Sequence, residues 1–267
     1  MKTRVTWITD VHLDFLQAEQ IDSFCGQIAR EQSDVVLIGG DIGQAGNIVE
    51  YLEYVEAKLS LPIYFVLGNH DYYRGSIAQV RERVTALSRN NQNLNWLPAS
   101  GVVELTPNTA LVGHDGWGDG RLGDYAGSSV MLNDFRLIGD LAGLDAVSRG
   151  EKLGLLGDEA AAYLYTVTSE ALTRYRRVIV LTHVPPFKRA CLYKGQIGGD
   201  EWLPHFTCKA VGDVLSGLMT KWSDKALTVY CGHTHHAGRI DILPNLRVVV
   251  GGAEYGAPEI QSTYEVA

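Results

Sequence analysis

Cysteine is scarce in this chain, and the cysteines it has stand far apart. There are four among 267 residues, and none forms a CxxC pair with another. This spacing indicates neither a disulfide framework nor a thiolate zinc site. We expect the four thiols to fill space in the core. They are Cys25, Cys191, Cys208 and Cys231.

Long hydrophobic runs are also absent. No apolar run approaches the ~18 residues that suggest a membrane span, and Met1 to Val5 leads directly into a strand pattern instead of a secretory leader. With 46% hydrophobic residues, a chain of 267 residues can bury one sizeable core. We therefore expect a single domain over residues 1–267, in a soluble cytoplasmic protein that does not bind a membrane.

Basic clusters are missing as well. The chain has 31 acidic and 23 basic residues, a net charge of −8, and no run of Lys or Arg longer than the pair Arg176–Arg177. Duplex nucleic acid is bound mainly through neutralised phosphates, so this balance argues against it as a partner. A small phosphate ester remains compatible, because two divalent metal ions would add about four positive charges locally.

Five short motifs containing His, Asp or Asn follow apolar runs, at the positions where strands should end. Taken alone, an Asp after a strand is ordinary turn chemistry. Five such motifs, each at its own strand end, indicate one shared site. They are DVH (Asp10–His12), GGD (Gly39–Asp41), GNHD (Gly68–Asp71), THVPP (Thr182–Pro186) and GHTH (Gly232–His235).

The polar side chains of these motifs predict a site for two divalent metal ions. They offer carboxylate, amide and imidazole groups and no thiolate. That set favours Mn, Fe or Zn, with Mg also compatible, over soft metals. The candidate ligands are Asp10, His12, Asp41, Asn69, His183, His233 and His235.

The ordered motifs resemble those of the metallophosphoesterase superfamily, the calcineurin-like phosphoesterases, and within it the class III cyclic-nucleotide phosphodiesterases. The resemblance extends from Asp10 to His235 through the motifs. It implies an α/β fold, the four-layer αββα sandwich of two mixed β-sheets flanked by helices. It also implies a hydrolase of phosphoric ester bonds, in which a hydroxide bridging the two metals attacks phosphorus in line.

The resemblance also implies a role for each motif residue. His70 would lie near the leaving group without binding a metal. Asp71 could orient the His70 ring, and a plain turn role for Asp71 stays open. Three ligands would hold each ion, with one bridge between the ions: Asp10, His12 and His235 for the first, Asn69, His183 and His233 for the second, and Asp41 as the bridge.

Two motifs differ from those of the protein-phosphatase branch of that superfamily. That branch typically reads GDxxDRG and GNHE. This chain reads GDIGQAG from Gly40 to Gly46, and Asp71 stands in place of the Glu. These differences argue against a phosphoprotein substrate.

The arrangement of strands and helices predicted from periodicity agrees with this fold. Short apolar runs alternate with segments whose apolar residues recur at helical spacing. The alternation predicts parallel strands buried on both faces, with ligands gathered beyond their carboxyl ends. Strands are expected at Val5–Thr9, Asp34–Ile38, Pro62–Leu67, Val178–Leu181 and Leu227–Cys231, and hairpins at Val102–Leu105 with Ala110–Gly113 and at Ile240–Leu243 with Leu246–Val250.

Two long segments fit no regular element, and we expect them to be lid-like insertions that choose the substrate. They run from about 114 to 157 and from about 187 to 206. Connections of this length in a compact domain tend to be functional. Four aromatic residues in or near the loops would either stack on a base or aryl group or simply pack the loops. They are Tyr72, Trp117, Tyr193 and Trp202.

The preferred function is a phosphodiesterase acting on a small or nucleotide-like phosphate ester. A phosphomonoesterase or nucleotidase would use the same centre, and a non-catalytic binding scaffold would keep the same fold. Retention of all seven ligands and of His70 favours catalysis over the scaffold. The lid segments carry few cations, which favours diesters, because a monoesterase must stabilise a second negative charge.

Overall fold

The structure is a computed structural model that describes residues 2–267. Its strands form two large sheets and one small one. The first sheet contains β1 (Thr3–Ile8), β2 (Val35–Ile38), β3 (Ile63–Phe65), β4 (Leu94–Trp96) and β13 (Ser262–Val266). The second contains β5 (Val103–Thr106), β6 (Thr109–His114), β7 (Arg177–Thr182), β10 (Ala226–Cys231), β11 (Gly238–Leu243) and β12 (Leu246–Val250). A separate hairpin pairs β8 (Leu192–Tyr193) with β9 (Gln196–Ile197).

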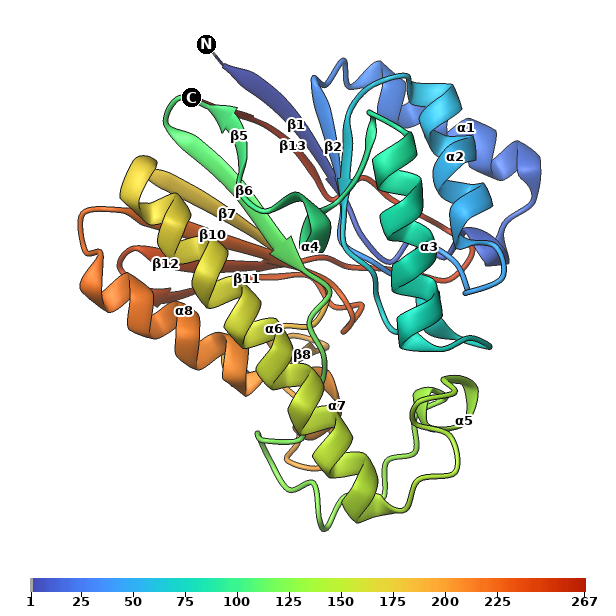
Figure 1. Cartoon of the computed structure of the whole chain (residues 1–267), viewed down its shortest axis with the longest axis vertical. Coiled ribbons are helices and arrows are strands. Elements are labelled where there is room, and N and C mark those ends of the chain that lie inside the picture. The colour runs from blue at the N-terminus through green and yellow to red at the C-terminus, as the bar shows by residue number, and fades with distance from the viewer. Residues whose placement is uncertain (1) are drawn as a thin grey trace.

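The helices lie outside the two large sheets. Figure 1 shows the first three long helices on one side of the molecule and the last two on the other. The long helices are α1 (Ala18–Arg30), α2 (Ile48–Leu59), α3 (Ile77–Asn90), α6 (Ala146–Arg174) and α8 (Lys209–Lys221). Three short ones are α4 (Leu97–Ser100), α5 (Asp134–Leu137) and α7 (Leu203–Phe206).

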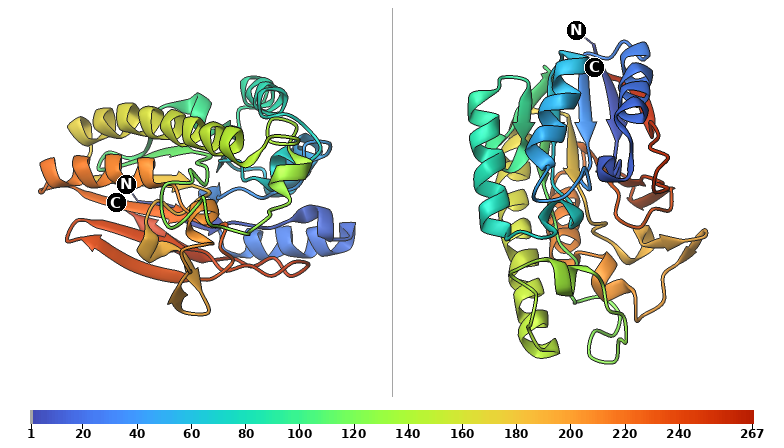
Figure 2. Two further views of the ribbon diagram at one scale, coloured as in Figure 1. Left: turned by 90° about the horizontal axis from the view of Figure 1, so that it is seen from below. Right: turned by 90° about the vertical axis from the view of Figure 1, so that its right-hand side faces the viewer.

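Both sheets are mixed. The first has the order β13-β1-β2-β3-β4 and the second β11-β12-β10-β7-β6-β5. Central strands pair in parallel, whereas the edge pairs β13–β1, β11–β12 and β5–β6 are antiparallel. The predicted four-layer αββα sandwich is therefore confirmed, and Figure 2 shows its layers from two further directions.

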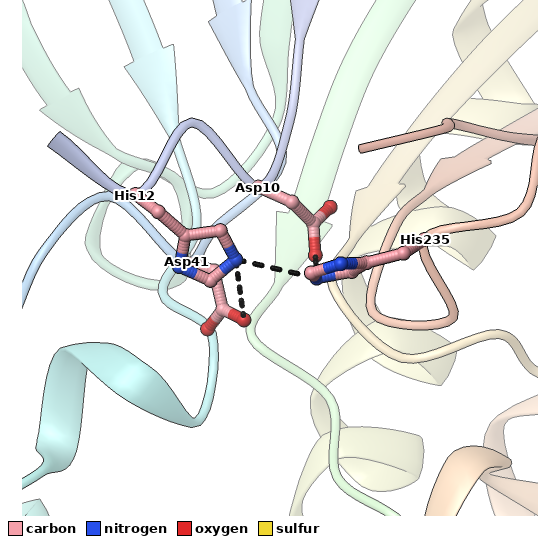
Figure 3. Close-up of side chains that lie close together, drawn as sticks. All are labelled: Asp10, His12, Asp41 and His235. Carbon is pink, nitrogen blue, oxygen red and sulfur yellow. Dashed lines mark hydrogen bonds and ion pairs between the residues drawn. The ribbon is translucent and has the colours of Figure 1, made fainter. Parts of the chain in front are cut away.

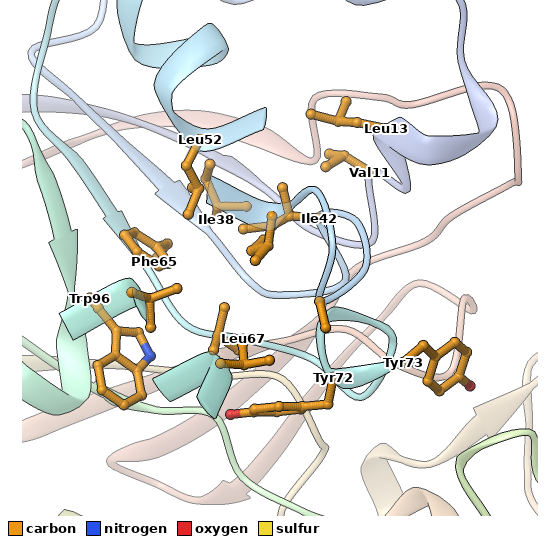
Figure 4. Packing of buried hydrophobic residues seen from close by; sticks show 14 of the residues in the cluster. Val11, Leu13, Ile38, Ile42, Leu52, Phe65, Leu67, Tyr72, Tyr73 and Trp96 are labelled. Atoms are coloured by element: carbon orange, nitrogen blue, oxygen red, sulfur yellow. The ribbon is translucent and has the colours of Figure 1, made fainter. Parts of the chain in front are cut away.

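The alternation of side chains along each strand builds the layers. Successive residues of a strand point to opposite faces of its sheet. In β2, Val36 and Ile38 join the core beneath α1 to α3, part of which Figure 4 shows, while Leu37 joins a second cluster between the sheets. On the other sheet, Val112 packs beneath α6 and α8, and Leu111 joins the same cluster between the sheets. Three apolar layers result.

The helices predicted between the strands are also confirmed. In α1 the buried residues are Ile21, Phe24, Cys25 and Ile28, a spacing of three, one and three residues that places them on one side of a helix. A capping box joins Gln17 to Gln20 at its start. The two predicted hairpins appear as β5–β6 and β11–β12.

Several elements differ from expectation or were not expected. The prediction of no regular element from 187 to 206 is wrong, because this segment contains the β8–β9 hairpin and α7. The prediction of no regular element from His114 to Gly157 is wrong at the short helix α5 and for the part after Asp145. There α6 begins at Ala146, and Asp145 caps it by accepting the amide of Ser148 at 2.8 Å. Gly150, Gly154 and Gly157 disguise this helix in sequence, since glycine disfavours helices. Helix α8 and the edge strand β13 were not expected, and β13 is too polar to stand out.

No helix in residues 2–267 combines the length and the apolar composition that crossing a membrane requires.

Candidate metal centre

The seven candidate ligands all lie just beyond the carboxyl ends of strands. In the first sheet they follow β1, β2 and β3; in the second they follow β7 and β10. The structure brings them together from both sheets, and two groups of side chains share Asp41. The first group is Asp10, His12, Asp41 and His235, and the second is Asp41, His183 and His233; the ligand atoms of each group lie within 4.8 Å of one another.

The first group joins ring nitrogens to carboxylate oxygens (Figure 3). The Nε2 atoms of His12 and His235 are 3.2 Å apart. Asp10 Oδ1 lies 3.4 Å from His235 Nε2, and Asp41 Oδ2 lies 3.9 Å from His12 Nε2. Four donor atoms thus face one point, which is the arrangement that a cation needs.

The second group lies on the other side of Asp41. His183 Nε2 is 3.4 Å from Asp41 Oδ2 and 3.2 Å from Asn69 Oδ1. His183 Nδ1 donates to the carbonyl of Gly39 at 2.9 Å, so Nε2 is the nitrogen that faces the site. His233 Nε2 donates to the carbonyl of His205 at 3.2 Å, which leaves Nδ1 as its ligand atom.

The electrostatics of these groups fit cations. Burial raises the pKa of Asp41, but His183, His70 and His12 outweigh burial and hold that pKa well below its ordinary value. Burial lowers the pKa of His12 to about 4 and that of His233 to about 3, so both rings are neutral, as metal ligands must be.

Two further features of the histidines agree with cation binding. His12 Nδ1 is buried without a hydrogen-bond partner. Although burial opposes it, Asp41 raises the pKa of His183 to about 10. A proton on His183 therefore stands where a cation would bind, and metal binding must release that proton.

The backbone at the ligands is strained. Asp10, His12, Asp41, His233 and His235 have φ values between 41° and 67°. This left-handed region is uncommon for residues other than glycine, although Asn, Asp and His enter it more readily than most. Such conformations cost of order 1–3 kcal/mol each and cluster at functional sites. Here the sharp turns after the strands aim the side chains at one point.

Two glycines explain why the motifs read GNHD and GHTH. A Cβ at Gly68 would overlap the carboxylate of Asp41, and a Cβ at Gly232 would overlap that of Asp10. Each glycine precedes a candidate ligand in its own loop and leaves room for a candidate ligand from another. The motif glycines thus permit the close approach of loops from neighbouring strands.

Asp71 is buried and holds the loops that carry the ligands. Its Oδ1 accepts the amides of Ile42 and Gly43, and its Oδ2 accepts the amide of Gly68, all at 2.8 Å. Both carboxylate oxygens are used in this way, and no hydrogen bond to His70 is found within residues 2–267. Of the two roles left open for Asp71, these hydrogen bonds favour that of holding the turns over that of orienting the His70 ring.

His70 lies beside the ligands as expected. Its amide donates to Asp41 Oδ1 at 2.9 Å. Its ring centroid lies 4.3 Å from that of Tyr73 and 4.6 Å from that of His12. The residue is partly exposed, unlike the buried ligands His12 and His183.

Sequence reasoning missed a second buried carboxylate, Asp115. Its Oδ1 accepts the amide of Leu67 at 2.8 Å and the indole of Trp96 at 3.0 Å, and its Oδ2 accepts the hydroxyl of Tyr72 at 2.7 Å. Its carbonyl accepts the amide of His183 at 2.9 Å. Asp115 thereby ties the end of β3 to the end of β7, one loop from each sheet.

Asp134 was missed as well. It lies in α5, within the first lid segment, and is 5% exposed. Its Oδ1 accepts the amide group of Asn69 at 2.9 Å and the hydroxyl of Tyr73 at 2.7 Å. The contact fixes the side chain of Asn69 with its NH₂ group toward Asp134 and its oxygen toward His183. No motif surrounds Asp134, so only a structure could reveal it.

Replacing Asp134 with Asn should weaken the metal position that contains Asn69. The substituted amide no longer holds Asn69 Nδ2 firmly, and loss of such an outer partner typically costs 10–100-fold in metal affinity. Metal titration by calorimetry would measure this, with Asp124→Asn, an exposed carboxylate in the same segment, as the control. Unchanged affinity at both positions would show that Asp134 does not position Asn69.

The aromatic residues expected at the lids divide into two sets. Tyr72 and Trp117 are 0% and 5% exposed, so they pack the structure and offer no face to a ligand. Tyr193 and Trp202 remain exposed at 59% and 46%. His205, in the second lid segment, is buried and helps line a small cavity of about 10 Å³ beside Asn69. This cavity has room for little more than a water molecule beside the second ligand group.

Comparison with known proteins agrees with this site. A family model described as calcineurin-like phosphoesterase matches residues 3–237. A probable cyclic nucleotide phosphodiesterase from Pseudoalteromonas sp. (strain SM9913) is 26% identical over 129 residues, which are 38% of this chain and 49% of that protein. The chain thus spans about half the length of the relative it matches.

Solved structures share the fold at low identity. A phosphopantetheinyl hydrolase from Mycobacterium tuberculosis has a TM-score of 0.60 at 14% identity, covering 93% of this chain and 89% of that one. A dimetal phosphatase from Danio rerio has a TM-score of 0.56 at 15% identity, covering 94% and 87%. At this low identity, the structural matches show a shared fold only. The family model, by contrast, matches the sequence itself over residues 3–237. The chain belongs to the calcineurin-like phosphoesterase family.

Proposed function

We propose that the protein is a hydrolase of phosphoric diesters that depends on two divalent metal ions and acts on a small or nucleotide-like substrate. The observation that carries the proposal is the pair of ligand groups sharing Asp41, with the partly exposed ring of His70 next to them. One ion would be held by Asp10, His12 and His235, the other by Asn69, His183 and His233, with Asp41 between them. Mn, Fe and Zn suit these ligands best.

Bound at these positions, two cations would supply an activated water and positive charge for the phosphoryl oxygens. The residues of the chain supply the rest. Asp41 fixes both ligand groups and, through its Oδ1, the backbone of His70. A protonated His70 would give its proton to the ester oxygen as the P–O bond breaks, so that the alcohol leaves uncharged.

Preference for diesters is supported by the partners of basic residues in the two lid segments. Of the basic residues in the two lid segments, Arg121 pairs with Asp158 at 2.6 Å and Lys188 with Asp200 at 3.0 Å. Arg189 donates to the carbonyl of Asp241 at 3.0 Å. These cations are engaged elsewhere, whereas a monoesterase needs charge for a second phosphoryl anion. The similarity to a probable cyclic nucleotide phosphodiesterase points the same way.

A comparison of esters tests the proposal. With Mn²⁺ added, kcat/KM for bis(p-nitrophenyl) phosphate and for cyclic AMP would be compared with that for p-nitrophenyl phosphate. We expect the bis-aryl diester to be preferred at least tenfold over the monoester, roughly 1.4 kcal/mol in transition-state free energy. A tenfold preference for the monoester would favour the phosphomonoesterase instead. Two bound metals with no turnover of any ester would favour the binding scaffold.

A further inference from the structure

Two half-exposed aromatic rings lie beside the histidines of the first ligand group. Phe15 is 52% exposed and Tyr255 is 47% exposed, in a structure that buries most of its large apolar side chains. Their ring centroids are 4.8 Å apart. Neither residue belongs to a motif or to either lid segment, and the fold does not require their exposure.

Tyr255 reaches the ligands directly. Its ring centroid lies 4.5 Å from that of His12, 5.1 Å from that of His235 and 6.1 Å from that of His70. Phe15 lies 6.0 Å from His12 by the same measure. The two rings therefore form a continuous apolar surface that ends at the candidate metal ligands and at the candidate proton donor.

The backbone holds this surface in place. Phe15 ends a single turn that begins at Leu13, directly after His12. Tyr255 lies in the connection from β12 to β13, where the amide of Ala253 donates to the carbonyl of His235 at 3.2 Å. The backbone of each residue is thus connected to a loop that carries a ligand, which keeps both rings near the site.

The burial of the other ligands leaves little room in any other direction. Asp10, His12, Asp41 and His183 are at most 2% exposed, and the cavity beside the second group, lined in part by Asp134 and His205, has a volume of only about 10 Å³. Asn69, His70 and His235 are partly exposed. An ester bound at the ligands must therefore extend its organic arm over the partly exposed residues, which brings it to Tyr255 and Phe15.

We propose that Phe15 and Tyr255 form a binding face for a planar aromatic group on one ester arm of the substrate. The inference rests on the proposed function and narrows its substrate class to esters that carry an aryl group or a nucleobase. Aromatic rings bind one another in offset or tilted stacks, with a gain beyond simple burial of area. Such a surface favours an ester arm with a planar ring, and polar substituents at the edge of that ring do not prevent stacking.

Binding of phosphonates tests the face without requiring turnover, because the C–P bond is not hydrolysed. Calorimetry on the metal-loaded protein would compare methylphosphonate, phenylphosphonate and the phosphonate analogue of adenosine 5′-monophosphate. We expect the ring-bearing ligands to bind roughly threefold to tenfold more tightly than methylphosphonate. The phenyl and adenosine ligands distinguish an aryl from a nucleoside arm.

Variants at the surface complete the test. Tyr255→Ala and Phe15→Ala should each reduce the preference for ring-bearing ligands, and the double variant should abolish it, while methylphosphonate binds as before. Tyr255→Phe should keep the preference, since the ring remains. Tyr165→Ala on α6, which removes a ring that is 50% exposed, is the matched control.

Two results would overturn the inference. One is equal affinity of wild-type protein for methylphosphonate and phenylphosphonate. The other is loss of the preference in Tyr193→Ala but not in Tyr255→Ala, because the exposed ring of the β8–β9 hairpin would then bind the arm. The binding test and the kinetic comparison of esters are independent. Either of these results would leave the proposed esterase activity standing, and a protein that hydrolysed no ester could still show the preference for ring-bearing phosphonates.

Discussion

Asp41→Asn should lower kcat/KM by at least about 10³-fold, or about 4 kcal/mol in transition-state free energy, and should reduce the metal content. Asp41 is the residue shared by the two ligand groups, and its Oδ2 lies 3.9 Å from His12 Nε2 and 3.4 Å from His183 Nε2. An amide retains the shape of the side chain but not the negative charge that offsets two neighbouring cations. Activity and elemental analysis after gel filtration would measure both effects.

The matched control for this variant is Asp119→Asn. Asp119 is also buried, at 2% exposure, and its carboxylate accepts the amide of Ala210 at 2.9 Å, but it belongs to neither ligand group. The Asp119→Asn protein should keep both metals. The comparison then distinguishes the loss of the bridging carboxylate from the general effect of replacing a buried carboxylate. An Asp41→Asn protein with two metals and wild-type rate would refute the bridging role.

His70→Gln should leave both metal positions filled and slow hydrolysis by about 10²- to 10⁴-fold for esters with poor leaving groups. Its ring lies beside His12 but belongs to neither ligand group. A proton donor matters most when the departing alcohol is weakly acidic, so p-nitrophenyl esters should lose much less rate than alkyl esters. The slope of log kcat against leaving-group pKa, measured for both proteins, tests this directly.

His236→Gln is the control for that experiment. His236 follows a candidate ligand in sequence, and its ring packs against Tyr193 at a centroid distance of 4.9 Å. It should keep the wild-type dependence on the leaving group. If His70→Gln instead emptied a metal position, His70 would be a ligand and its assignment as the proton donor would be wrong.

The sequence predicts the fold and the ligand set well because both rest on local patterns. Strand ends such as Ile8 and Ile38 are apolar and lead straight into motifs, and parallel strands bring such ends together. The supporting residues follow no local pattern. Asp134 and Tyr255 reach the site through tertiary packing of segments without motifs, and the burial of Trp117 decides between the two roles that its loop position left open. Only the three-dimensional arrangement relates such residues to the site.

The division of each ligand group between the two sheets has a consequence for residues far from the site. Asp10 and His12 come from the first sheet and His235 from the second, so the spacing of the ligands depends on how the sheets slide past one another. The apolar cluster between the sheets, which includes Trp7 and Leu181, determines that alignment. Displacements of about 1 Å are enough to impair catalysis. The side chains between the sheets therefore set the distances between the ligand atoms. Changing the volume of one of them should affect catalysis as well as stability.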